Sequence, residues 1–297
     1  MALVDTRENR TSGILWMLAT MLCFIALDAI MKYSLESYSL LQVTWGRFFF
    51  GTMFAAMMCG PQLLLLSKSK TPRKQLLRSV LLMSTTGMFN AGIRSTPLAT
   101  GTTIMFLSPI LVTLLSIPLL GEKVGLRRWA GIVMGFAGAA IVVRPWETGL
   151  GGTGIGLMFL LAAAFFNANY QIVTRMVRED DPLTSLLFTA TAGAVVTSFA
   201  LPWFWSWPDF AGWLLLVGSG LAGALGHFCL IRALRLAPAS VVAPFSYSSL
   251  IWATLFGFIF WRDWPDWWMW VGAAIIIGSG LYIFHREHGR QELAVET

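Results

Sequence analysis

The chain has 297 residues, of which 56% are apolar and 12% are charged, and its mean hydropathy is +0.68. A water-soluble fold of this size exposes too much surface to bury so many apolar residues, and a disordered chain is far more polar. The net charge of +6 comes from basic residues in short clusters between apolar runs. Such clusters are typical of lipid contact and topology signals, so we expect a lipid bilayer as partner and no nucleic acid.

Ten apolar runs follow one another along the chain, each close to the roughly 20 residues that cross a bilayer as a helix. They cover residues 13–33, 38–59, 76–94, 97–119, 127–144, 153–174, 183–201, 211–231, 237–260 and 266–284. The sequence therefore predicts an all-α membrane protein with ten transmembrane helices. The first run holds Asp28 and Lys32 and precedes no small-residue cleavage site, so we interpret it as a span and not as a signal peptide.

Lysine and arginine are unevenly divided between the two predicted sides. With a cytoplasmic N-terminus, 16 of them lie in inner segments, and the outer segments hold four: Lys32, Arg94, Arg144 and Arg262. Arg47 lies within a span. An excess of Lys and Arg marks the cytoplasmic side, and tryptophans on the other side fit an interfacial belt. An even number of spans then places both termini in the cytoplasm.

The sequence matches itself without gaps when it is shifted by 141 positions. The shift places Pro97 on Pro238, Trp129 on Trp270, and Glu122 on Asp263. Because the repeating unit holds five spans, an odd number, its second copy enters the membrane from the opposite side. The prediction is a 5+5 inverted-topology repeat with units 13–144 and 153–284, an architecture shared by many secondary transporters. Duplication retained for packing alone is the alternative.

The repeated segments resemble a known family. They run from Thr96-Pro97-Leu98-Ala99 through Pro109 to Leu120-Gly121-Glu122, and from Leu236-Ala237-Pro238-Ala239-Ser240 through Pro244 to Asp263. Over both units the chain resembles the drug/metabolite transporter superfamily, EamA type. That resemblance implies ten helices around a central cavity and a small-molecule substrate. Arg262-Asp263 departs from the Gly-Glu pattern of the first copy.

Further segments are most similar to the bacterial riboflavin transporter group. They are Ala26-Leu27-Asp28, Leu41-Gln42-Val43-Thr44-Trp45, Arg47-Phe48-Phe49-Phe50, Asn167-Ala168-Asn169-Tyr170-Gln171 and Ala243-Pro244-Phe245-Ser246-Tyr247. A related group that carries S-adenosylmethionine shares the Asp–Lys pair, the Arg-Phe-Phe-Phe run and the Ala-Pro-x-x-Tyr segment. The resemblance implies the bacterial cytoplasmic (inner) membrane as location.

Ionisable residues inside spans are costly, so each needs a partner or a task. Asp28 and Lys32 share a helix face at i, i+4, and Asp28 is expected to reach Lys32 or Arg47. These three residues are candidates for gating or coupling, and a static ion pair is the alternative. His227 titrates near neutral pH and is a candidate proton carrier, with a satisfied hydrogen-bonding group as the alternative.

The candidate substrate-binding residues are polar or aromatic side chains within the spans. They are Asn90, Phe106, Asn167, Asn169, Tyr170, Gln171, Ser246, Tyr247 and Trp252. Buried amides are expensive without a watery cavity, and aromatic walls stack against planar heterocycles. Hydrogen bonding between helices and packing against lipid are the alternatives. Kinks are expected at Pro109 and Pro244, because proline removes a backbone donor.

Sequence motifs for enzymes are missing. The segment 149–154 fits GxGxxG but follows an apolar span, so we expect a loop that joins the repeats. The sequence contains no Walker A, GxSxG or HExxH motif, and its three cysteines form no CxxC pair. We therefore expect no cofactor, no metal and no enzymatic activity.

The predicted function is a secondary transporter that imports a small amphipathic metabolite, riboflavin first, by alternating access. An exporter of amino acids or drugs and an S-adenosylmethionine transporter of the same fold are the alternatives. A lipid-modifying enzyme and a channel fit less well, because no nucleophile is clustered with a base and a channel needs no inverted halves. Protons are one candidate coupling ion and facilitated transport is the other option. The sequence leaves monomer and homodimer open.

Overall fold

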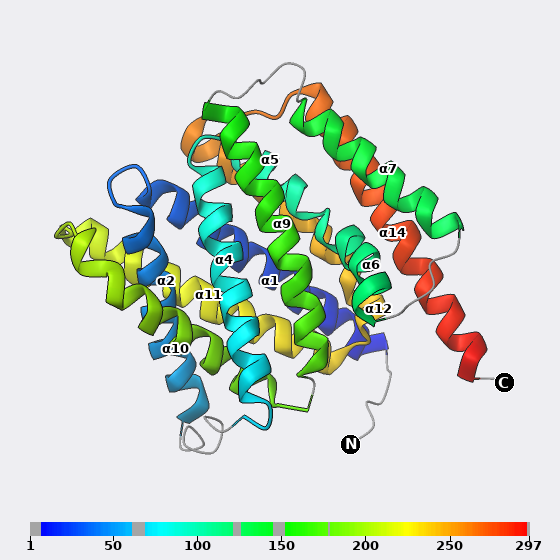
Figure 1. Ribbon diagram of the computed structural model, residues 1–297, viewed down its shortest axis with the longest axis horizontal. Helices are drawn as coiled ribbons and strands as arrows, with labels where there is room; N and C mark the ends of the chain where they lie inside the picture. The colour runs from blue at the N-terminus through cyan, green and yellow to red at the C-terminus, as the bar shows by residue number, and fades with distance from the viewer. Residues whose placement is uncertain (1–6, 61–68, 121–125, 145–151, 178, 296–297) are drawn as a thin grey trace.

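The computed structural model describes residues 7–60, 69–120, 126–144, 152–177 and 179–295, and these residues form helices with no β-strand among them (Figure 1). The helices are α1 (Arg7–Ser34), α2 (Leu40–Cys59), α4 (Pro72–Ile93), α5 (Leu98–Met105), α6 (Ser108–Leu120), α7 (Leu126–Val143), α9 (Gly152–Met176), α10 (Pro182–Ala200), η2 (Leu201–Trp203), α11 (Phe210–Leu236), α12 (Ala239–Val242), η3 (Ala243–Ser248), α13 (Ser249–Phe256), η4 (Gly257–Trp261) and α14 (Trp267–Val295). The segment 149–154 was predicted as a loop, but its residues 152–154 are helical, and 149–151 lie outside the described residues. Glu122 also lies outside them.

Several helices begin at side chains that cap their free backbone N–H groups. Ser39 accepts a hydrogen bond from the Gln42 amide at the start of α2, and Asp181 accepts one from the Leu183 amide at the start of α10. Asp209 caps α11 in the same way. Each cap satisfies a donor that has no partner within its helix. These polar residues therefore fix where the apolar helices begin.

The helices pack in pairs that the 141-residue shift relates to one another. α1 packs along α11 and α9 packs along α4 (Figure 1), and the shift carries the first pair onto the second. α2 packs on α10 and α7 on α14, and the shift exchanges the two members of each pair. The start of α5 at Leu98 maps to the start of α12 at Ala239. The main helix pairs are thus kept when the two halves are exchanged.

Two opposite groups of helix ends follow from this packing. At one end, the last turn of α1 contacts the α4–α5 and η4–α14 connections, and Arg144 after α7 pairs with Asp266 before α14. At the other end, residues 69–71 contact Asp180 between α9 and α10, and Gly13 of α1 meets Ala237. We call these the first and second ends of the bundle.

Two of the long rods are interrupted near the prolines named above. α5 and α6 are separated at Phe106 and Leu107, two residues before Pro109, and the backbone there makes i to i−3 hydrogen bonds. The segment 239–261 changes from α12 to the 3₁₀-helix η3, which contains Pro244, then to α13 and the π-helix η4. Because proline lacks an N–H, regular α-helical bonding stops at these positions.

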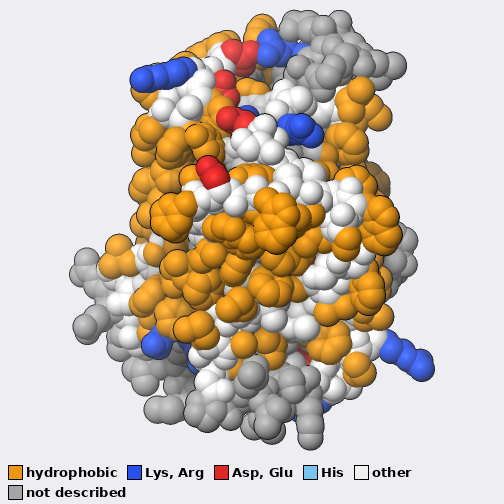
Figure 2. Space-filling model, turned by 90° about the vertical axis from the view of Figure 1, so that its left-hand side faces the viewer, with side chains coloured by type: hydrophobic (Ala, Val, Ile, Leu, Met, Phe, Trp, Pro, Cys, Tyr) orange, Lys and Arg blue, Asp and Glu red, His pale blue; other side chains and the backbone are white. Residues whose placement is uncertain are grey.

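Within the described part of the chain, six helical stretches are long and apolar enough to cross a membrane. They are Asn9–Ser34, Leu98–Leu115, Gly154–Met176, Pro182–Trp203, Phe210–Leu236 and Ala243–Trp261, and Trp129–Val143 and Trp267–Tyr282 are shorter apolar helices. The predicted spans 38–59 and 76–94 coincide with α2 and α4, which fall outside this set. Arg47 in α2 and Arg78 in α4 are among the polar residues that lower their apolar content. Figure 2 shows the apolar band on one face, with charged side chains gathered toward its upper and lower edges.

Candidate functional site

A buried arginine of α4 ties this helix to α9 and α10. Arg78 is 7% exposed, and its Nε donates to Thr174 Oγ1 at 2.9 Å. One Nη donates to the Ser185 carbonyl at 2.9 Å and to Thr189 Oγ1 at 2.6 Å, and the other donates to the Tyr170 hydroxyl at 2.6 Å. The guanidinium also lies 4.7 Å from the centre of the Tyr170 ring. Four hydrogen bonds and a cation–π contact fix both side chains in the interior.

The second interior arginine lies on α2 and is held less completely. Arg47 Nη1 donates to Thr86 Oγ1 of α4 at 3.0 Å, and the side chain is half-buried. Asp28 of α1 and the Tyr170 ring system of α9 lie within its electrostatic reach. Among the described residues, no hydrogen bond or ion pair joins Asp28 to Arg47, and the expected approach of Asp28 to Arg47 stays a prediction.

His227 of α11 belongs to the same interior group. Its ring meets the edge of Phe24 of α1 with centroids 5.1 Å apart, and it remains partly accessible. Both Arg47 and Arg78 act on it electrostatically. We name Asp28, Arg47, Arg78, Tyr170 and His227 the central cluster, and its members come from α1, α2, α4, α9 and α11.

The predicted amides lie at different positions around this cluster. Asn90 is 1% exposed, its Nδ2 donates to Thr44 Oγ1 at 3.4 Å, and its Oδ1 has no partner. Asn167 donates to Ser108 Oγ at 3.1 Å, beside the interruption between α5 and α6. Asn169 donates back to the Phe165 carbonyl of its own helix. Gln171 is half-buried on α9.

The predicted aromatic residues gather at the interrupted rods. Phe106 meets the edge of the Tyr247 ring with centroids 5.0 Å apart, and the Tyr247 hydroxyl approaches Gly280 of α14. Trp252 packs against the main apolar core, and its buried Nε1 has no hydrogen-bond partner. Ser246 donates to the Ala243 carbonyl within η3. The structure thus brings Phe106 and Tyr247 together, and within the described part of the chain no hydrogen bond or ring contact joins Ser246 or Trp252 to them.

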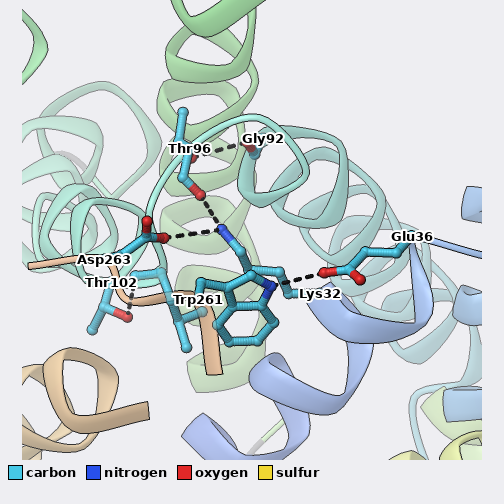
Figure 3. A network of polar contacts seen from close by, with 8 residues as sticks. Lys32, Glu36, Gly92, Thr96, Thr102, Trp261 and Asp263 are labelled. Carbon is cyan, nitrogen blue, oxygen red and sulfur yellow. Dashed lines mark hydrogen bonds and ion pairs between the residues drawn. The ribbon is translucent and has the colours of Figure 1, made fainter. Parts of the chain in front are cut away.

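The i, i+4 spacing suggested that Lys32 pairs with Asp28, but the structure shows other partners. Its amine donates to the Thr96 carbonyl at 2.5 Å and lies 3.9 Å from Asp263 Oδ2 and 5.2 Å from the Trp261 ring centre. Figure 3 shows the amine between Thr96 and Asp263, with Trp261 also bound to Glu36 through its indole nitrogen at 2.8 Å. We call this group the first-end network. It joins α1 to the α4–α5 connection of the first half and to the η4–α14 connection of the second.

A second polar group closes the opposite end. Asp180 accepts hydrogen bonds from Ser69 Oγ, the Lys70 amide, Thr71 Oγ1 and Gln75 Nε2 at 2.5–3.3 Å. Partial burial raises the pKa of the Asp180 carboxyl, but these hydrogen bonds outweigh that effect and hold its pKa below the usual value. We call this group the second-end network. It ties the start of α4 to the α9–α10 connection.

Sequence reasoning missed some of these residues. Arg78 is one of the 16 basic residues that the sequence assigned to the inner segments, yet the structure buries it. Thr86 and Asp263 were not singled out as partners of Arg47 and Lys32. The available signal was the i, i+4 spacing of Thr86 and Asn90, which places those two residues on one face of α4. Among the described residues, no group of three His, Cys, Asp or Glu side chains is placed to hold a metal ion.

The sequence matches the EamA-like transporter family over residues 11–144 and again over residues 154–284. The chain belongs to this family. It is 27% identical to an S-adenosylmethionine uptake transporter of Rickettsia bellii, over 95% of this chain and 97% of that protein. It is 29% identical to a riboflavin transporter of Vibrio cholerae, over 94% of this chain and 95% of that protein. One crystal structure, 18% identical, shares the fold with a TM-score of 0.64 over 91% of this chain and 95% of that one.

These comparisons establish a transporter with a small-molecule substrate and several apolar helices for the bilayer. They also cover both repeats, so the two matched segments account for most of the chain. The relatives named for riboflavin and for S-adenosylmethionine are similarly distant from this chain.

Proposed function

We propose that this EamA-family chain is a secondary transporter that imports a small amphipathic metabolite across the bacterial cytoplasmic membrane, with riboflavin as the first candidate. The central cluster is the observation that carries this proposal. Asp28, Arg47 and Arg78 come from the first half, and Tyr170 and His227 from the second. Charged and polar groups at bilayer depth are costly and mark substrate pathways. A polar site shared by both halves is what alternating access requires.

The inverted arrangement of the two halves is part of the proposal. The 141-residue shift and the helix pairs that it exchanges support two five-helix units of opposite topology. The excess of Lys and Arg supports placing the second end in the cytoplasm, with ten spans and both termini on that side. Each half then rocks against the other around the central cluster, while the substrate does not change chemically.

The two end networks serve as gates in this scheme. The first-end network joins the halves on the outer side through Lys32, and the second-end network joins them on the inner side through Asp180. Opening one side requires its network to separate, whereas the other remains closed. Asp28, Arg47 and His227 are proposed to sense the substrate or a proton, because they are ionisable members of the central cluster that are less fully hydrogen-bonded than Arg78.

Riboflavin uptake tests the proposal. The chain is expressed in a bacterium that cannot make riboflavin, and growth is followed as the external vitamin is reduced. We expect growth at low riboflavin with the chain and none with an empty vector. Asn167→Leu, which removes the hydrogen bond to Ser108, should lower uptake, while Phe165→Leu on the exposed side of the same helix should not. Growth no better than that of the vector control would refute riboflavin import.

S-adenosylmethionine is the second candidate substrate, because a relative of similar identity is named for its uptake. Uptake of labelled S-adenosylmethionine is measured in the same cells and compared with uptake of riboflavin.

A further inference from the structure

The central cluster has an excess of positive charge. Arg47 and Arg78 are opposed by one interior carboxylate, Asp28. The other acidic side chains that the structure describes lie near helix ends or in connections: Glu36, Glu179, Asp180, Asp181, Asp209, Asp263 and Asp266. Asp180, on the side of Arg78, is bound by Ser69, Lys70, Thr71 and Gln75. The interior therefore disfavours a substrate that adds a further positive charge.

The two arginines differ in what they can offer a ligand. Arg78 is buried and donates hydrogen bonds to Thr174, Ser185, Thr189 and Tyr170. Arg47 is half-buried and donates one hydrogen bond, to Thr86, although a guanidinium carries five N–H donors. Arg47 is thus the residue of the pair that keeps most of its N–H donors free of the hydrogen bonds that hold Arg78.

An unsatisfied acceptor lies on α4, four residues from Thr86, the hydrogen-bond partner of Arg47. The Arg47–Thr86 and Thr44–Asn90 contacts form two neighbouring links between α2 and α4. The Oδ1 atom of Asn90 is buried and lacks a donor. Leaving such an atom unpaired costs about 1–3 kcal/mol, so a ligand that supplies an N–H or O–H group stabilises the site.

We infer that the substrate presents an electron-rich acceptor to Arg47 and an adjacent hydrogen-bond donor to Asn90, and that it carries no net positive charge. This inference rests on the proposed transport function and separates its two candidate substrates. The pyrimidine-dione edge of a flavin has an N–H between two carbonyl groups and is neutral. S-adenosylmethionine carries a sulfonium and an ammonium group against one carboxylate. Arg47 and Asn90 are therefore specificity-determining residues for a flavin-like ligand.

Competition at the unmodified protein is the first test. Purified protein is placed in liposomes, and uptake of labelled riboflavin is measured with and without a large excess of S-adenosylmethionine. We expect saturable riboflavin uptake that the excess leaves unchanged. Equal inhibition by unlabelled riboflavin and by S-adenosylmethionine would overturn the inference. Uptake of S-adenosylmethionine without riboflavin would also overturn it while leaving transport intact, and uptake of neither solute would refute the transport proposal itself.

Charge variants of Arg47 form the second test. Arg47→Gln should raise the riboflavin KM by roughly tenfold or more, because a hydrogen bond from a charged donor is lost. It should also make S-adenosylmethionine a stronger inhibitor, whereas Arg47→Lys should retain the discrimination. Arg175→Gln, at the exposed end of α9, makes the same charge change outside the site. It should alter neither the riboflavin KM nor the inhibition by S-adenosylmethionine. An unchanged preference in a folded Arg47→Gln protein contradicts the inference, and the unmodified protein decides if that variant fails to fold.

Discussion

Replacing Lys32 by methionine should open the first end of the bundle. The substitution keeps the length and apolar stem of the side chain and removes the amine. That amine donates to the Thr96 carbonyl at 2.5 Å and lies near Asp263 and Trp261 (Figure 3). These contacts exist only while α1, the α4–α5 connection and the η4–α14 connection stay together. Their loss therefore destabilises the closed arrangement relative to the open one.

The size of the effect follows from the contacts. A hydrogen bond from a charged donor contributes about 1.5–3 kcal/mol, and the cation–π contact adds about 0.5–1 kcal/mol. The ion pair adds little, because the Asp263 side chain is 35% exposed and its charge is screened by solvent. The amine regains water when the end opens, so we take about 2 kcal/mol as the net change. That value shifts the ratio of open to closed molecules roughly 30-fold.

Cysteine labelling measures this shift. Asn90→Cys is introduced into a chain whose Cys23, Cys59 and Cys229 have been replaced, since Asn90 is 1% exposed in the last turns of α4. A membrane-impermeant maleimide applied to intact cells should label this cysteine tens of times faster when Lys32→Met is present. Lys70→Met, an exposed lysine at the other end, is the control and should leave the rate unchanged. Equal rates with and without Lys32→Met would show that the first-end network does not hold this end closed.

Two further predictions concern stability in detergent solution. Asp180→Asn should lower the free energy of unfolding by about 2 kcal/mol at pH 7, because several hydrogen bonds to a carboxylate are weakened. Since the pKa of Asp180 is held below the usual 3.8, the unmodified protein should keep this stability advantage above pH 3.8 and lose it as the pH falls through the lowered pKa. A difference in thermal unfolding between the two proteins that stays constant down to pH 3 would contradict this. Gly220→Ala should destabilise the protein by about 1–3 kcal/mol, because the added Cβ would lie 2.6 Å from the Gly51 amide nitrogen of α2. Gly218→Ala is the control and should be tolerated, because its added Cβ meets nothing closer than 3.7 Å. Equal melting temperatures for the two variants would refute the close packing of α11 on α2.

Much of the helical layout could be predicted from the sequence. Apolar runs of span length predict where helices lie, and a helix occupies each predicted range as far as the structure describes it. Pro109 and Pro244 also marked where the rods lose α-helical bonding, because a missing N–H is a local property. Asn167 was predicted to bind substrate, with hydrogen bonding between helices as the alternative; it donates to Ser108, and its role toward a substrate stays a prediction.

The partners of the charged groups could not be predicted in the same way. Helical spacing placed Asp28 and Lys32 on one face, yet the Lys32 amine binds Thr96 and approaches Asp263. Those partners come from connections that only tertiary packing brings to the end of α1. Arg78 resembled a flanking charge because it lies near a basic run, but its partners on α9 and α10 bury it. Local spacing identifies the face of a helix and does not identify the helix that covers it.

The most direct test of the account asks on which side of the membrane equivalent positions of the two halves lie. Lys70 and Ala211 are 141 residues apart, and both are exposed near the start of a helix. Each is changed to cysteine in the cysteine-free chain and treated with an impermeant maleimide, first in intact cells and then after permeabilisation. With halves of opposite topology, Ala211→Cys should be labelled in intact cells and Lys70→Cys only after permeabilisation. Labelling of both in intact cells, or of neither until the membrane is opened, would contradict two halves of opposite topology around one shared site.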